Sequence, residues 1–148
     1  MRSLILSLAI CSLVGFTHAD GRGALMPIPN VSTAATGRTL TVNMLFDAAK
    51  GMRFEPKNIA INRGDVIRFV NVSGGPHNVA FNPTKITAAG RAPLTAAMPN
   101  QTSPLTGPLM ITPNAAYTIS FANVPAGTYP YYCTPHLAMG MTGVITVK

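Results

Sequence analysis

Acidic residues are scarce in this sequence, and none of them follows Asp65. The chain of 148 residues has four Asp and Glu against 11 Lys and Arg, for a formal net charge of +7. The four acids are Asp20, Asp47, Glu55 and Asp65. The second half of the chain therefore lacks the paired carboxylates on which many hydrolases depend.

Runs of basic residues are also absent, because Lys and Arg are scattered singly along the chain. Nucleic-acid-binding proteins usually cluster their basic residues on one face or along one helix. The pattern therefore argues against a nucleic-acid partner. It predicts instead a generally positive electrostatic field, which favours acidic protein partners.

Long apolar runs are missing everywhere except at the N-terminus. Arg2 precedes an apolar stretch at 4–16, and residues 17–19 approximate a small-x-small cleavage signal. The stretch is shorter than the roughly 20 residues that span a membrane, so we expect residues 1–19 to be a cleaved signal peptide. Cleavage would leave 129 residues (148 minus 19) as a soluble, exported protein without a membrane anchor. The periplasm is the expected compartment, with the thylakoid lumen and the extracellular space as alternatives.

Cysteine and histidine are few in the part of the chain that cleavage would leave. Loss of Cys11 and His18 leaves one cysteine, Cys133, and two histidines, His77 and His136. An odd cysteine in an oxidising compartment is a disulfide to a partner, a reactive thiol or a metal ligand. Ligation would protect the thiol from oxidation, which favours the metal.

Short alternating or β-branched stretches between Gly- and Pro-rich turns predict one all-β domain at 38–148. We expect strands at residues 39–44, 54–61, 66–72, 78–81, 117–121, 128–133 and 144–147. Pro56 argues that the second of these is an edge strand. Residues 20–37 are predicted to be a flexible leader. Residues 82–113 are predicted to be irregular, with one helical turn near 94–98, and to cover one flank of the core. The pattern indicates an antiparallel β-sandwich.

A short loop at 131–141 carries the residues with the most distinctive chemistry. It holds Cys133, His136, Met139 and Met141, and His77 lies far upstream in a Gly-Gly-Pro-His-Asn corner. Two histidines, a cysteine and a weak axial methionine are the ligands of a blue-copper site. Zinc fits less well, because its sites rarely use a thioether. The alternative is that Cys133 and the methionines simply fill the core.

These motifs resemble those of the cupredoxins, and within them the plastocyanin/pseudoazurin group. The resemblance runs from about residue 51 to residue 148 and is carried by Gly-Pro-His-Asn before position 79, Tyr-Cys-Thr-Pro-His at 132–136 and Gly-Met-Thr-Gly-Val-Ile-Thr-Val at 140–147. It implies a Greek-key β-sandwich and one copper ion, Cu(I) or Cu(II). The matching ligands are His77, Cys133, His136 and Met141, and Asn78 matches an asparagine that ties the two ligand loops together.

The chain departs from its relatives at several points. Pseudoazurins add helices after the last strand, and plant plastocyanins carry acidic residues beside the tyrosine that corresponds to Tyr132. Met139 stands at the spacing of amicyanin-like sites, whereas Met141 stands at the plastocyanin spacing. We expect Met141 to be the axial ligand and Met139 to lie on the exposed rim, with Gly140 turning the chain back inward.

The resemblance implies a monomeric one-electron carrier that shuttles between larger redox proteins. These partners, acidic ones among them, are expected to dock transiently on an apolar ring around His136. The ring consists of Gly75, Pro76, Pro135, Leu137, Ala138 and Met139. The alternative is a periplasmic carrier or buffer that delivers copper, for which Met98 and Met110 are candidate thioethers. An enzyme is not expected, because both remaining histidines are assigned to the metal and none is left for a catalytic triad.

Overall fold

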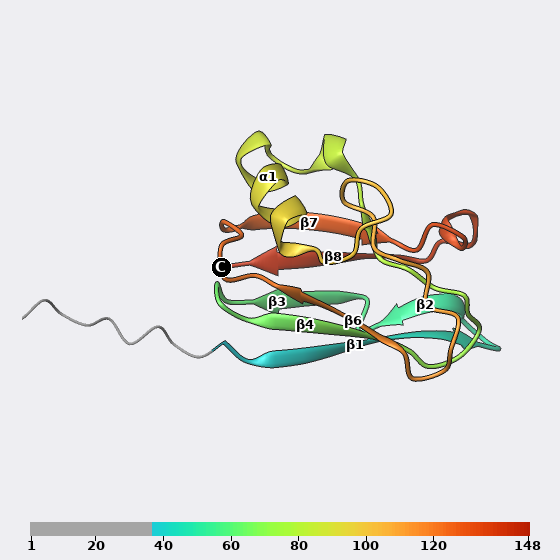
Figure 1. Cartoon of the computed structure of the whole chain (residues 1–148). Helices are drawn as coiled ribbons and strands as arrows, with labels where there is room; N and C mark the ends of the chain where they lie inside the picture. Colours follow the sequence, from blue (N-terminus) through green and yellow to red (C-terminus); the bar gives the residue numbers. More distant parts are fainter. Residues whose placement is uncertain (1–36) are drawn as a thin grey trace, which may run out of the picture. The chain divides into compact units, whose positions relative to one another are not determined.

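The computed structural model describes residues 37–148, and these fold as two four-stranded sheets packed face to face (Figure 1). The predicted signal peptide and residues 20–36 of the predicted leader lie outside the described residues. The strands are β1 (Thr39–Asp47), β2 (Gly51–Glu55), β3 (Asn58–Ile61), β4 (Val66–Asn71), β5 (Ala80–Phe81), β6 (Ala116–Ser120), β7 (Gly127–Tyr132) and β8 (Thr142–Val147). The helical elements are the 3-10 turns η1 (Pro83–Lys85) and η2 (Leu137–Met139) and the helix α1 (Ala88–Ala97).

One sheet has the strand order β2-β1-β4-β6, and the other has the order β3-β8-β7-β5. This arrangement confirms the expected Greek-key β-sandwich. Four of the six strand pairs are antiparallel, whereas β1 and β4, and likewise β3 and β8, run parallel. The sheets are therefore mixed rather than wholly antiparallel. Between β1 and its parallel neighbour β4, the chain leaves their sheet after β2, passes through the other sheet as β3 and then returns.

The single strand predicted at 54–61 is wrong, since this stretch divides into β2 and β3, which belong to different sheets. Pro56 lies at the division, and a proline has no N–H to offer to a strand ladder. The edge prediction is nevertheless confirmed, because β2 and β3 are each the outermost strand of their sheet.

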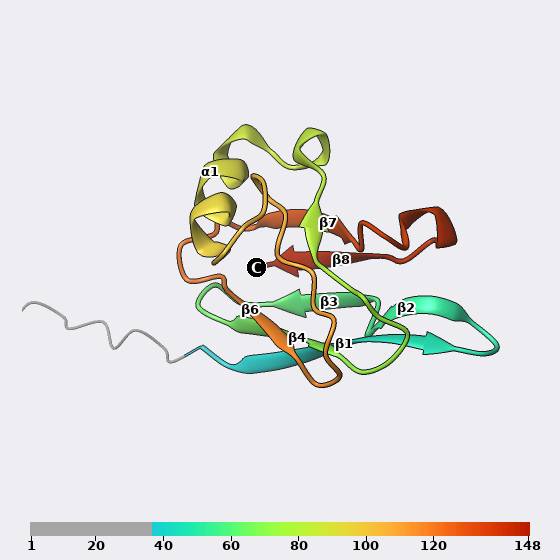
Figure 2. The same ribbon diagram turned by 45° about the vertical axis from the view of Figure 1, so that its right-hand side comes forward.

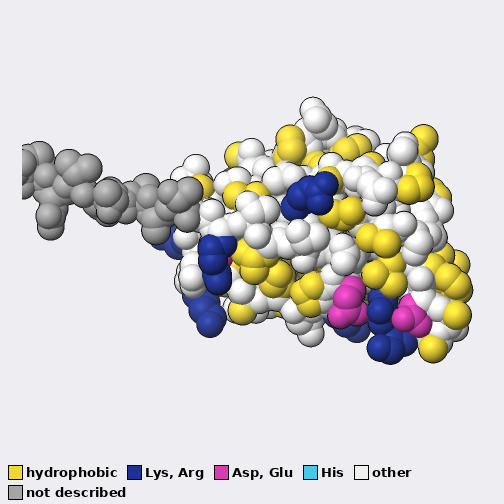
Figure 3. Space-filling view, turned by 90° about the horizontal axis from the view of Figure 1, so that it is seen from below, with side chains coloured by type: hydrophobic (Ala, Val, Ile, Leu, Met, Phe, Trp, Pro, Cys, Tyr) yellow, Lys and Arg dark blue, Asp and Glu magenta, His cyan; other side chains and the backbone are white. Residues whose placement is uncertain are grey.

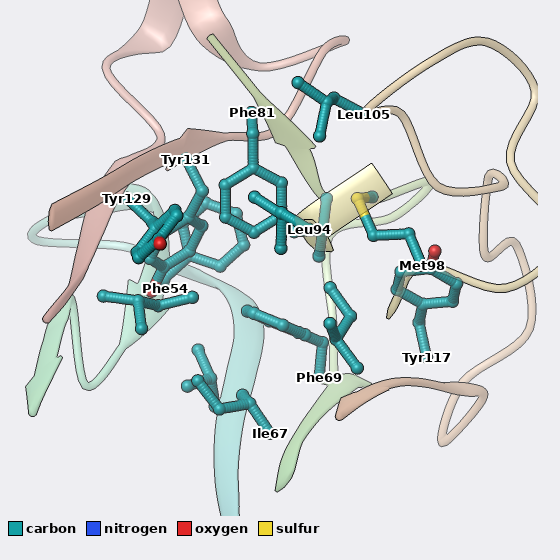
Figure 4. Close-up of a cluster of buried hydrophobic side chains, with 14 of the residues drawn as sticks. Phe54, Ile67, Phe69, Phe81, Leu94, Met98, Leu105, Tyr117, Tyr129 and Tyr131 are labelled. Atoms are coloured by element: carbon teal, nitrogen blue, oxygen red, sulfur yellow. The ribbon is translucent and has the colours of Figure 1, made fainter. Parts of the chain in front are cut away.

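Alternating side chains from the two sheets meet in one apolar core. Along β7, Tyr129 and Tyr131 are buried while their neighbours are partly exposed, as the two-residue period of a strand requires. The Tyr131 ring packs edge-on against Phe54 and Phe69, with centroids 4.6 and 5.5 Å away. Figure 4 shows these rings among the buried hydrophobic side chains of the sandwich. Each such buried side chain stabilises the fold by about 1.5–3 kcal/mol.

The segment between β5 and β6 covers one flank of this core, as expected, but it is more helical than the sequence suggested. In place of one turn near 94–98, α1 extends over ten residues. Thr87 caps its N-terminus by accepting a hydrogen bond from the Gly90 N–H at 3.2 Å. Gly90 and Leu94 face the core, and Gly90 leaves room for the Tyr129 ring. The Ala-rich composition and the Thr87 cap were the missed helix signals, masked by Gly90 and Pro93.

Figure 2 shows that α1 lies towards one end of the sandwich and that the β7–β8 connection lies at the other. Within residues 37–148, no helix has both the length and the apolar character that a membrane span requires. The β7–β8 connection contains Cys133 and His136, so the residues singled out from the sequence lie at the end away from the helix.

Candidate metal centre

Three elements bring the candidate ligands to one end of the sandwich. Cys133 directly follows β7, and His136 lies three residues later in the turn before η2. His77 comes from the connection between β4 and β5. His77 is more than fifty positions from Cys133 and His136, so the folding of the sheets, and not the local sequence, brings it to the other two.

The three side chains converge on a common point. The Cys133 Sγ lies 3.6 Å from the Nδ1 of His77 and 3.4 Å from the Nδ1 of His136, and the two Nδ1 atoms are 3.1 Å apart. All three residues are buried, with His136 retaining the most exposure at 7%. A thiol and two imidazole nitrogens at this separation form a trigonal donor set, which suits a soft metal such as copper.

The orientation of the His77 ring is set by the backbone around it. Its Nε2 lies 2.9 Å from the Ser73 carbonyl oxygen, so the Nε2–H donates there and the Nδ1 lone pair points into the centre. The backbones of His77 and Met110 form a β-bridge: the His77 N–H donates to the Met110 carbonyl (N to O 3.1 Å), and the Met110 N–H donates to the His77 carbonyl (N to O 2.7 Å). The ring is therefore held in its tautomer and position without a metal.

Burial keeps both imidazoles in the form that a metal needs. It lowers the pKa of His77 and of His136 below the usual value, because desolvation disfavours the charged imidazolium. For His77, the hydrogen bond to Ser73 partly opposes this effect and the neighbouring His136 adds to it. Neutral imidazoles with free Nδ1 atoms are the ligand form.

Burial also raises the pKa of the Cys133 thiol. The backbone N–H groups of Asn78 and His136 lower this pKa again and so partly offset the desolvation. Without a cation the thiol is the favoured form, and a bound metal ion would supply the positive charge that stabilises the thiolate.

The two candidate axial methionines differ sharply in exposure. Met141 is fully buried, whereas 65% of Met139 is exposed on the surface of η2. Between them, Gly140 adopts φ +79°, a left-handed conformation that glycine accepts readily. The predicted inward turn at Gly140 is confirmed. The Met141 backbone is tied to both ligand residues, since its carbonyl accepts the Cys133 N–H at 3.1 Å and its N–H donates to the His136 carbonyl at 3.2 Å.

Asn78 joins the two loops that carry the candidate ligands. Its Nδ2 donates to the Thr134 Oγ1 at 3.1 Å, and its Oδ1 accepts the Thr134 N–H at 2.7 Å. The sequence suggested the role of Asn78 but missed Thr134. It also missed Asn71, which donates from Nδ2 to the Met110 and Thr112 carbonyls and so holds the segment that pairs with His77. Asn71 sits at the end of a strong β-strand pattern, and nothing in the local sequence marks its distant partners.

The surface around His136 is largely apolar. All six residues of the apolar ring expected from the sequence are exposed. Leu109 and Ile111, on either side of Met110, are exposed as well. Met98 and Met110, the candidate thioethers for copper delivery, are buried in the core.

Comparison with known proteins places the chain among proteins of this kind. The model of the copper binding proteins, plastocyanin/azurin family, matches residues 40–148. A plastocyanin of Synechococcus sp. is 37% identical over 118 residues, which cover 80% of this chain and 79% of that protein. The plastocyanin of Prochlorothrix hollandica is also 37% identical, over 77% of this chain and 76% of its own.

Two solved structures share the fold. The oxidised plastocyanin of the fern Dryopteris crassirhizoma has a TM-score of 0.56 at 26% identity, over 74% of this chain and all of that one. A pseudoazurin from Sinorhizobium has a TM-score of 0.52 at 30% identity, over 75% of this chain and 74% of that one. The resemblance stated from the motifs is confirmed.

Proposed function

Because the chain belongs to the plastocyanin/azurin family of copper-binding proteins, we propose that it is an exported one-electron carrier. One copper ion would be held by His77, Cys133, His136 and Met141 and would alternate between Cu(II) and Cu(I). The observation that carries the proposal is the buried convergence of the Cys133 Sγ and the two Nδ1 atoms.

The bound copper would supply a single redox-active orbital, and the protein's contribution is to hold the donors still. The His77 ring is fixed by the Ser73 carbonyl, and the ligand loop is fixed by hydrogen bonds among Cys133, His136 and Met141. Fixed donors limit the rearrangement that accompanies a change of oxidation state. A small rearrangement favours fast electron exchange, which is the property an electron carrier needs.

His136 is the proposed exit for the electron. It is the least buried of the three convergent residues, and exposed apolar residues surround it. A partner that covers Leu137 and Pro135 would approach the His136 ring and exclude water from the contact. Small apolar contacts of this kind are weak and short-lived, which suits a carrier that must leave after each transfer.

Export and the monomeric state are parts of the same proposal. The signal peptide predicted at 1–19 supports export, with the periplasm as the expected compartment. A role as an enzyme is not proposed, because the two histidines in the described part of the chain both face the candidate centre and no imidazole remains there for acid–base work.

The alternative of copper delivery loses its main support. A site that hands over copper needs accessible thioethers, whereas Met98, Met110 and Met141 are all buried. Met139 is exposed, but it stands alone in the ring of apolar residues around His136. The geometry therefore favours an enclosed centre that exchanges electrons faster than it exchanges its metal ion.

The proposal is tested on the copper-loaded protein. The oxidised protein is expected to bind one copper and to be intensely blue, through thiolate-to-Cu(II) charge transfer, and Cys133→Ser should abolish the colour while the fold remains. Electron self-exchange should be fast on the NMR timescale, while transfer of copper to an external chelator should be slow. Rapid loss of copper with slow self-exchange would reverse the choice between carrier and buffer.

A further inference from the structure

Among the methionines at 37–148, one side chain is far more exposed than the others. Four methionines are buried in the core cluster: Met44, Met98, Met110 and Met141. Met52 is partly buried and packs against this cluster. Met139, in contrast, is 65% exposed. A reagent in solution that attacks thioethers therefore meets Met139 before any other methionine in this part of the chain.

The exposure of Met139 is fixed by the turn that carries it. In η2, the Met139 N–H donates to the His136 carbonyl at 3.0 Å, and the Gly140 N–H donates to the Leu137 carbonyl at 2.9 Å. Gly140, at φ +79°, then turns the chain inward to the buried Met141. Moving the Met139 side chain into the core would require this turn to open. The Met139 thioether is therefore held at the surface, three residues from His136.

A hollow of about 310 Å³ beside Met139 gives a small molecule room to approach the side chain. Its lining includes three basic residues, Lys50, Arg53 and Lys57. The one acidic residue in the lining, Glu55, pairs with Arg53 at 3.2 Å. Figure 3 shows acidic side chains lying beside Lys and Arg side chains on the face seen from below. The hollow therefore places N–H donors next to an exposed thioether.

These donors suit an oxidised methionine better than a reduced one. The Arg53 Nε is buried and has no hydrogen-bond acceptor within residues 37–148. A thioether sulfur is only a weak acceptor, whereas the sulfoxide formed by its oxidation is polar. An oxygen added to the Met139 sulfur would therefore have hydrogen-bond donors beside it that the reduced side chain hardly uses.

The other sulfur atoms near the centre are shielded from an oxidant. Cys133 and Met141 are both 0% exposed, and oxidation of sulfur follows its exposure. At Met139, a hydroperoxide can transfer its terminal oxygen to the sulfur. An S–O bond forms and the O–O bond breaks, so the sulfur loses two electrons and the peroxide gains them. The proton of the terminal oxygen passes to the departing oxygen, which leaves as water or an alcohol.

We propose that Met139 is a site of reversible oxidation by hydroperoxides, and that its sulfoxide weakens the contact of partners with the apolar ring around His136. The second half of the proposal rests on the proposed electron-carrier function. A partner that covers the ring would have to strip water from the sulfoxide, which costs free energy that a thioether does not. Met141 keeps its thioether, so the centre itself is unchanged. Methionine sulfoxide reductases, which return the sulfoxide to the thioether, can reach the exposed side chain.

The test treats the Cu(II)-loaded protein with hydrogen peroxide, which catalase then removes. Tandem mass spectrometry should locate one added oxygen atom on Met139 before any appears on Met52, Met141 or Cys133. Electron self-exchange of the treated protein should be about fivefold or more slower than before treatment, because each ring then brings a polar group without a partner into the contact. The blue colour and the reduction potential should not change.

Two leucine variants provide the matched controls, each compared with its own rate before peroxide. Met139→Leu should gain no oxygen and should keep its untreated self-exchange rate. Met52→Leu, which removes the other thioether of the hollow, should be oxidised and slowed like the parent. Methionine sulfoxide reductases with thioredoxin should remove the oxygen from the parent and restore its rate.

Three outcomes would overturn the proposal. Equal rates of oxidation at Met52 and Met139 would show that exposure does not select the site. Oxygen on Met141 or Cys133, or loss of the blue colour, would make the centre itself the target. Complete oxidation of Met139 with unchanged self-exchange would mean that the sulfoxide does not act on the contact. Mass spectrometry locates the oxygen without any electron transfer, so this failure is separate from a failure of the carrier function, which self-exchange of the untreated protein measures.

Discussion

Asn78 and Thr134 are joined by two hydrogen bonds, although 56 residues separate them in the sequence. The Thr134 N–H donates to the Asn78 Oδ1 at 2.7 Å, and the Asn78 Nδ2 donates to the Thr134 Oγ1 at 3.1 Å. Each residue is adjacent to a candidate ligand, His77 in one case and Cys133 in the other. This pair therefore sets the separation of the two loops that a metal would have to bridge.

Replacing Asn78 should destabilise the protein more than replacing Thr134. Asn78→Ala leaves the Thr134 N–H without its acceptor and should lower the free energy of unfolding of the metal-free protein by about 1–3 kcal/mol. Thr134→Ala removes only one side-chain hydroxyl and should lower the free energy of unfolding by about 0.5–1.5 kcal/mol. Guanidinium unfolding curves of both variants check the order. Equal costs would show that the backbone hydrogen bond to Asn78 contributes little.

The two methionines of the ligand loop should respond differently to leucine. Met141→Leu should keep the copper and raise the reduction potential, because loss of the axial thioether removes a donor that favours Cu(II). Met139→Leu should leave the potential nearly unchanged, since its side chain is 65% exposed. Voltammetry of the two copper-loaded variants measures the difference. A large shift from Met139→Leu beside a silent Met141→Leu would exchange their assignments.

A charge placed beside His136 should slow electron exchange without altering the centre. Leu137 is 48% exposed in the apolar ring, so Leu137→Lys should slow electron self-exchange by about tenfold or more, because two like charges then meet in the encounter complex. The visible spectrum should not change. Thr146→Lys adds the same charge at an exposed position of β8, away from the ring, and serves as the control. If the self-exchange rate of Leu137→Lys is unchanged, the electron does not leave through His136.

The ion pair between Asp65 and Arg38 should make stability depend on pH in acid. Hydrogen bonds from the Arg38 side chain and the Asn62 N–H lower the pKa of Asp65 from 3.8 to about 2. A carboxyl whose pKa is lowered by folding stabilises the protein above its unfolded value, and this stabilisation is lost as the pH falls through the folded value. At neutral pH, the melting temperature of Asp65→Asn should therefore be lower than that of the parent protein. The two melting temperatures should converge as the pH falls from 3.8 to about 2.

Glu55→Gln is the control for that experiment, since Glu55 also pairs with an arginine, Arg53, but its side chain is far more exposed than that of Asp65. Its melting temperature should stay close to the parent value throughout the acid range. A gap between the parent and Asp65→Asn that persists at the lowest pH would mean that the amide, and not the lost charge, destabilises the variant.

The sequence by itself predicted most strands, the residues that meet in the candidate centre and the direction of the turn at Gly140. These features depend on local chemistry: β-branched alternation, the spacing of Cys133 from His136 and the conformational freedom of glycine. The same local reasoning failed at residues 54–61 and at α1. In the first case, division of the strand at Pro56 depends on which sheet each half joins. In the second, the helix is completed by packing of Gly90 and Leu94 on the core.

Only the tertiary structure brought the Nδ1 of His77 within 3.6 Å of the Sγ of Cys133. It also placed Met52 and Met139 beside one hollow, although they are 87 positions apart (139 minus 52). Such pairings depend on strand order and register across two sheets. Strand order and register are decided by burial of the whole core, which no local stretch of sequence contains.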